Sequence, residues 1–138
     1  MNNPLPIINR MASNLKLMFL LDGFGALLSF LLLGVVLVKL ERTIGMPIQA
    51  LDILAKIAGV FAIYSFFCAF LIKKNWRPFL KIIAFANLSY CLLTFSFLLY
   101  HQAHLTTIGN LYFLLEIIII VGIALFELKV ARVTNDLN

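Results

Sequence analysis

Four long apolar runs constrain this chain more than any other feature of its sequence. They cover approximately residues 17–38, 51–72, 79–100 and 108–128. One membrane crossing takes about 20 mostly apolar residues, because a helix of that length spans the hydrocarbon core of a bilayer. Barrel strands are shorter and alternate apolar with polar residues, so continuous runs exclude them. The sequence therefore predicts an all-α membrane protein with four transmembrane helices.

The composition supports this fold class. Hydrophobic residues make up 63% of the 138 residues, and charged residues make up 12%. Soluble domains average about 45–50% and about 25%, and a soluble domain of this size leaves too much surface in water to hide the excess. The connections between the runs are short, so consecutive helices should be antiparallel neighbours. We expect a single transmembrane domain over residues 1–138, folded as an antiparallel up-down bundle.

Helix-breaking and capping residues separate the runs. Gly45 and Pro47 follow the first run, and Pro78 stands at the start of the third, where its missing N–H costs little. Thr107 precedes the fourth run, and threonine is a common N-cap. We therefore expect Thr107 to cap the fourth helix.

Lysine and arginine are shared unequally between the two predicted sides of the membrane. Three lie on the side of the first loop, namely Lys39, Arg42 and Lys56. Eight lie on the side of the termini and the second loop, namely Arg10, Lys16, Lys73, Lys74, Arg77, Lys81, Lys129 and Arg132. The side richer in Lys and Arg is normally cytoplasmic. The sequence predicts an inner (plasma) membrane protein with cytoplasmic N and C termini. Its charge of +5 should contact anionic lipid headgroups rather than nucleic acid.

Two acidic side chains fall inside the predicted spans. Glu116 lies near the middle of the fourth run, and Asp22 lies in the first. A charged group at mid-membrane costs about 2.5–3.5 kcal/mol on insertion scales, so such residues usually face the protein interior. Helical periodicity predicts an inward face of the fourth helix that contains Gly109, Tyr112, Glu116, Ile120, Ile123 and Glu127.

Small residues predict where helices pack closely. Asp22 shares its face of the first helix with Gly25, Ala26 and Ser29, and Gly25 and Ser29 have the spacing of a small-residue packing motif. We expect this face to approach another helix. The second helix has its own small face, formed by Ala58, Ala62, Ser65 and Ala69.

Counting the helical rise places several polar residues at one depth. Tyr64 of the second run, Asn87 and Tyr90 of the third, and Glu116 should all lie near the membrane centre. We expect them to form a buried polar cluster, with Asp22 nearer the cytoplasm, and take these five residues as a candidate binding or proton site. The alternative is that their hydrogen bonds only join helices, at about 0.6 kcal/mol each.

Other candidates for chemistry are few. His101 and His104 stand three residues apart, so on a continuing helix they could share a face and bind a metal ion or haem iron, whereas solvated loop histidines are the alternative. Cys68 and Cys91 have no partner at metal-ligand spacing, which predicts two free packing cysteines. The sequence contains none of the hydrolase, zinc-protease, P-loop or dinucleotide motifs. No cofactor is expected.

Three segments resemble a group of small, uncharacterised, four-span bacterial inner-membrane proteins. They are Leu21–Ser29, Gly45–Pro47 and Leu115–Ile118. This resemblance implies no activity. In length and span number the chain is also similar to small multidrug exporters, which carry an essential glutamate in their first span. Asp22 is the acid in the first span here, so that function is not transferred.

These observations leave three functional classes open. The first is a non-catalytic accessory or assembly protein, which acts as a homo-oligomer or with another membrane protein. The second is a small oligomeric transporter or channel that uses Glu116, Asn87 and Asp22. The third is a membrane redox or lipid-modifying enzyme, which depends on the two histidines and two cysteines. A cavity at Glu116 and Asn87 would favour the second class, and sealed hydrogen bonds would favour the first.

Overall fold

Helices account for nearly all of the structure. The computed structural model describes residues 15–72 and 76–136, with side chains for 17–72 and 77–132, and this part of the chain contains no strand. Its elements are α2 (Leu15–Leu31), η1 (Leu32–Val36), α3 (Leu37–Lys39), α4 (Glu41–Ile44), α5 (Ile48–Leu71), α6 (Trp76–Tyr100) and α7 (Thr107–Asp136).

The four long helical segments are long and apolar enough to cross a membrane. They comprise Leu17–Lys39, Ile48–Leu71, Arg77–Tyr100 and Thr107–Arg132. Large apolar side chains cover the outside, as lipid-facing helices require. Ile63, Leu92 and Ile118, for example, are 73%, 68% and 67% exposed. The prediction of an all-helical chain with four apolar membrane-length helices is confirmed.

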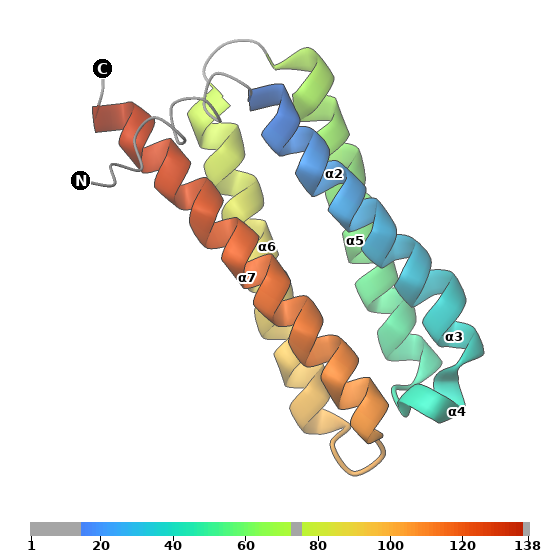
Figure 1. Cartoon of the computed structure of the whole chain (residues 1–138). Coiled ribbons are helices and arrows are strands. Elements are labelled where there is room, and N and C mark those ends of the chain that lie inside the picture. The colour runs from blue at the N-terminus through green and yellow to red at the C-terminus, as the bar shows by residue number, and fades with distance from the viewer. Residues whose placement is uncertain (1–14, 73–75, 137–138) are drawn as a thin grey trace.

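The long helices form two pairs that lie side by side (Figure 1). α2 packs most extensively against α5, and α6 against α7, while α5 and α6 make the smaller contact between the pairs. Figure 1 shows α4 and the 101–106 connector at one end, which we call the α4 end. The start of α2 and the end of α7 lie at the other, which we call the Asp136 end.

The first membrane segment contains one π-helical turn. Within η1 the N–H of Leu37 donates to the carbonyl of Leu32, five residues earlier, instead of the usual four. The turn adds a residue to the helix and rotates the turns beyond it. Leu33 and Leu37 are buried, whereas Val35 and Val36 face outward. The sequence predicts an uninterrupted helix here, because nothing in Leu-Leu-Gly-Val-Val signals a π turn.

The small residues of α5 form a buried face. Ala58, Ala62, Ser65 and Ala69 are all buried, which confirms their predicted packing face. The contacts from α2 were not predicted correctly. Nothing lies within 4 Å of a Cβ built at Gly25, whereas one built at Gly23 meets the ring of Phe66. The predicted approach through Gly25 and Ser29 is wrong, because α2 turns Gly23 and not Gly25 toward α5.

A polar joint connects the two pairs at the α4 end. Thr106 N–H donates to the carbonyl of Ile44 at 3.1 Å, and its hydroxyl lies 3.0 Å from the same oxygen. That hydroxyl also accepts from the N–H of Gly109 at 3.1 Å. Thr106 is therefore the N-cap of α7, and the prediction of Thr107 is wrong by one residue. The hydroxyl satisfies a free donor of the helix start and also docks α4.

Two glycines make this joint possible. Gly45 ends α4 with φ of +87°, in the left-handed region where residues with a side chain are strained. A Cβ at Gly45 would also collide with the carbonyl oxygen of His104, and one at Gly109 would collide with that of Ile44. Both obstacles are backbone atoms, which cannot rotate away.

The substitution Gly109→Ala tests how tightly the joint is packed. We expect it to lower the free energy of unfolding in mixed micelles by about 1–3 kcal/mol, the usual cost of forcing a group into a filled site. Gly122→Ala on the same helix is the matched control, because nothing lies within 4 Å of its Cβ. Equal stability of the two variants would contradict the packing described here.

Two hydrophobic clusters hold the ends of the molecule. The cluster at the α4 end includes Leu33, Met46, Leu51, Leu54 and Phe113. The cluster at the Asp136 end includes Phe19, Cys68, Leu80, Ile83 and Val130. Polar residues and a cavity occupy the level between them.

Candidate functional site

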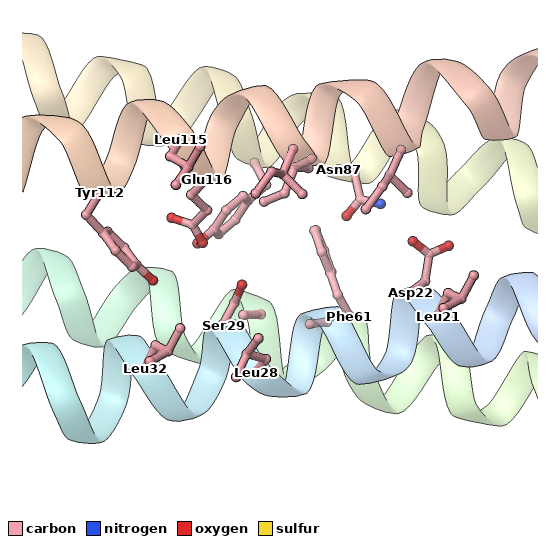
Figure 2. Close-up of a pocket in the computed structure, with 17 residues that line it drawn as sticks. Leu21, Asp22, Leu28, Ser29, Leu32, Phe61, Asn87, Tyr112, Leu115 and Glu116 are labelled. Carbon is pink, nitrogen blue, oxygen red and sulfur yellow. The ribbon is translucent and has the colours of Figure 1, made fainter.

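A partly open cavity of about 230 Å³ separates α2 from α7 (Figure 2). We call it the cleft. α2 and η1 form one wall and α7 forms the other, while Ala58 and Phe61 of α5 and Asn87 and Tyr90 of α6 complete the lining. The α2 and η1 wall contains Leu21, Asp22, Gly25, Ala26, Leu28, Ser29 and Leu32. The α7 wall contains Tyr112, Leu115, Glu116, Ile119, Ile120 and Ile123.

The cleft exists because α2 presents small side chains toward α7. Gly25 and Ala26 lie at its middle, and a Cβ at Gly25 would meet open space. One water needs only about 10–15 Å³, and an engineered apolar cavity of about 150 Å³ binds benzene. The cleft is therefore large enough for a small organic molecule.

Glu116 is the centre of the first polar group in the cleft. It is 9% exposed, and the hydroxyl of Tyr90 donates to its Oε1 at 3.2 Å. The hydroxyl of Ser29 donates to the same carboxyl group from the opposite wall. Figure 2 shows Ser29 and Glu116 directed toward each other across the cleft. Oε2 of Glu116 is buried and has no partner among the described residues.

Asp22, Asn87 and Glu127 form the second polar group, nearer the Asp136 end. The side-chain amide of Asn87 donates to Asp22, and the carboxyl groups of Asp22 and Glu127 are hydrogen-bonded to each other. Asp22 is 8% exposed and Glu127 is 2% exposed. Asp22 Oδ2 and Glu127 Oε2 are buried and accept no hydrogen bond from an N–H or hydroxyl group of the described residues. Because an ionised carboxylate only accepts, this contact requires a proton on one of the two groups.

Among the side chains that the structure describes, none that is basic compensates these acids. The groups that interact with Asp22, Glu116 and Glu127 are hydroxyl, phenol, amide and carboxyl groups, and no described lysine or arginine is among them. Lys81 and Lys129 are exposed. A buried carboxylate without a counter-ion is costly, so it either holds a proton or attracts a cation. The acids of the cleft therefore favour the presence of a proton or a cation.

Tyr64 lies apart from the other predicted site residues. Its hydroxyl donates to the backbone carbonyl of Phe79 at 3.0 Å, and its other polar neighbour is Cys68. It does not line the cleft. Asn87, Tyr90, Glu116 and Asp22 all do, so the structure brings four of the five predicted residues together.

The histidines and cysteines form no common site. α6 ends at Tyr100, so His101 and His104 lie in a turn and not on a continuing helix. The described residues contain no group of three or more side chains that could hold a metal ion. Cys68 and Cys91 are free and buried on different helices. The enzyme class has no support from their arrangement.

Glu127 was not among the five predicted site residues, although periodicity placed it on the inward face of the fourth helix. It stood at the end of the predicted span, where an acid can reach water. α7 instead continues to Asp136, and Glu127 is almost completely buried. The available signal was its spacing of eleven residues from Glu116, which is three helical turns on one face.

The chain matches no known protein family, no curated protein and no solved structure. Chemistry alone therefore indicates what its site can bind. The carboxyl groups of Asp22 and Glu116 line an apolar cavity, together with one amide, two phenol groups and one hydroxyl group. Such a cavity can accept hydrogen bonds from a positively charged guest and can exchange protons with it.

Proposed function

We propose that this multi-pass membrane protein is a non-catalytic carrier that binds small lipophilic ammonium compounds in the cleft. The observation that supports this proposal is the position of Glu116 and Asn87. Both line a cavity large enough for a ligand, instead of being sealed among helices. The first of the three functional classes, an accessory or assembly role, does not account for this cavity.

The lining matches an amphiphilic cation in both of its parts. Glu116 offers a buried oxygen without a described partner to the ammonium group. The rings of Phe61 and Tyr112 line the same cavity, and aromatic faces attract cations. Leu28, Ile119 and the other aliphatic residues would cover the apolar part. Hydrocarbon surroundings strengthen the charge interaction, because little water screens it.

The arrangement in the membrane forms part of the proposal. We place the four helices as an antiparallel up-down bundle and single domain in an inner membrane, with cytoplasmic termini. The bias of eight basic residues against three supports this orientation, although Arg10, Lys73 and Lys74 lie outside the described residues. Four helices enclose little volume, so a complete transport path would form between two copies of this chain.

Binding of phenethylamine tests the proposal. In nanodiscs the protein should bind this cationic arylamine and not its neutral analogue 2-phenylethanol, with empty nanodiscs as the blank. Glu116→Gln should weaken binding about tenfold, because a hydrogen bond to a charged group is worth about 1.5–3 kcal/mol. Equilibrium dialysis or calorimetry measures the affinity.

Asp52→Asn is the matched control for charge. Asp52 pairs with Lys56 at 2.8 Å on the exposed face of α5, outside the cleft. This variant also removes one carboxylate and should bind as the wild type does. Equal weakening by both substitutions would indicate a general charge effect and contradict a specific role of Glu116.

A further inference from the structure

The Asp22–Glu127 contact joins the two helix pairs at the far end of the cleft from the polar joint. Asp22 belongs to α2 of the first pair and Glu127 to α7 of the second. Their hydrogen bond crosses the same gap that opens into the cleft a few residues further along. On the side of the Asp136 end, Phe19 of α2 and Val130 of α7 belong to one hydrophobic cluster, and on the other side the cleft separates the two helices.

At the α4 end, the two helix pairs are held together tightly. Thr106 binds Ile44 through both its N–H and its hydroxyl, and the backbone at Gly45 and Gly109 is packed against His104 and Ile44. A relative movement of the two pairs would therefore pivot at the α4 end. It would be larger at the Asp136 end, where the carboxyl pair and the apolar contacts of the Asp136-end cluster hold the two pairs together.

The chemistry of the pair makes this contact depend on a single proton. With one proton the two carboxyl groups share a hydrogen bond, and without it two negative charges face each other in a buried site. Both carboxyl groups are buried, and Asp22 is directed into the cleft, as Figure 2 shows.

The neighbouring elements supply few groups that could replace that proton. α5 contributes Tyr64 and Cys68, which contact each other, and the neutral Ser65. α6 contributes the neutral Asn87, while its Lys81 is exposed. On α7 the nearest other titratable groups are Glu116, three turns away, and the exposed Lys129. Arg77 of α6 is half-buried and has its own interaction.

We infer that Asp22 and Glu127 form a proton-binding latch that couples ammonium binding to proton release. The shared O–H bond breaks, the proton leaves to water at the Asp136 end, and the negative charge left on Asp22, which lines the cleft, offsets the charge of the cation held at Glu116. One positive charge enters as one leaves, so the buried charge is conserved. The loss of the hydrogen bond lets α2 and α7 separate. The coupling rests on the proposed function, whereas the latch itself does not.

The latch is tested first without any ligand. Spin labels on Leu17→Cys and Lys129→Cys, with Cys68 and Cys91 replaced by alanine, report the α2–α7 distance at the Asp136 end. Raising the pH should shift this distance to larger values. Glu127→Gln should abolish the shift, because its amide still donates to Asp22 at every pH. Labels on Lys39→Cys and Ile108→Cys at the α4 end should show no shift. If the α2–α7 distance did not change with pH in the labelled protein that retains Asp22 and Glu127, the latch would be overturned.

Proton release on adding phenethylamine tests the coupling. The wild type should release one proton for each cation bound, measured with a pH indicator in weakly buffered nanodiscs, and Asp52→Asn should do the same. Asp22→Asn and Glu127→Gln should release none. Binding without release in the wild type would overturn the coupling and leave the proposed function intact. Absence of binding would overturn the proposed function, and the ligand-free distances would still decide on the latch.

Discussion

Gly25→Trp is expected to weaken phenethylamine binding at least about a hundredfold, which corresponds to about 2.8 kcal/mol. Gly25 lies on the α2 wall of the cleft, and nothing stands within 4 Å of a Cβ at this position. An indole ring can therefore enter the cavity without moving the backbone. It would occupy the volume that the ligand needs, so every contact is lost together. The expected effect is larger than that of Glu116→Gln, which removes one interaction. Equilibrium dialysis in nanodiscs measures both.

Gly122→Trp is the control for adding a large side chain. Gly122 belongs to α7, also has open space at its Cβ, and does not line the cleft. This variant should keep the affinity of the wild type. Unchanged binding in Gly25→Trp would show that the ligand binds elsewhere, and would contradict the assignment of the cleft.

The helical content and the number of membrane-length helices could be predicted because the hydrocarbon of a membrane restricts which backbone structures are possible. A backbone in hydrocarbon must satisfy its own hydrogen bonds, so a long apolar run leaves one choice of structure. The observed helix ends differ from the predicted ones where a side chain caps the helix. α7, for instance, begins after Thr106 and continues past the predicted end at about residue 128 to Asp136.

Contacts between helices were harder to predict because they depend on how each helix is rotated about its own axis. Periodicity located the small face of α5, since four residues four or three apart point one way. It did not locate the partner face of α2. Gly23 and Gly25 differ by about 200° around that helix, so one faces α5 while the other borders the cleft. The π turn at Leu32–Val36 has no signal in the sequence.

Depth counting was informative for part of the site. It placed Tyr90 and Glu116 at one level, and the structure joins them by a hydrogen bond. It also placed Tyr64 there, but depth says nothing about which side of a helix a residue faces. Tyr64 instead contacts the backbone of Phe79 at the α5–α6 interface. The contact between Asp22 and Glu127 could not be derived, because it requires knowing that α7 stays buried as far as Glu127, at the end of the predicted span.

Phe113→Ala should cause the largest loss of stability among single substitutions in the α4-end core. Phe113 of α7 is fully buried in the cluster that contains Leu33, Leu51 and Leu54 of the other helix pair. In water-soluble proteins such a truncation costs about 3–5 kcal/mol, as the sum of a transfer term and a cavity term. In a membrane the unfolded helices keep the ring in lipid, so the transfer term is nearly absent. We therefore expect about 2 kcal/mol, measured as the free energy of unfolding in mixed micelles.

Phe85→Ala is the control that separates the transfer term from the cavity term. Phe85 is 59% exposed on α6, so its ring faces lipid in both the folded and unfolded states. Its removal leaves no internal cavity and should change stability by only a few tenths of a kcal/mol. A loss in Phe113→Ala as small as that in Phe85→Ala would mean that the helix pairs do not interlock through Phe113. The α4 end would then not be the fixed pivot on which movement at Asp22 and Glu127 depends.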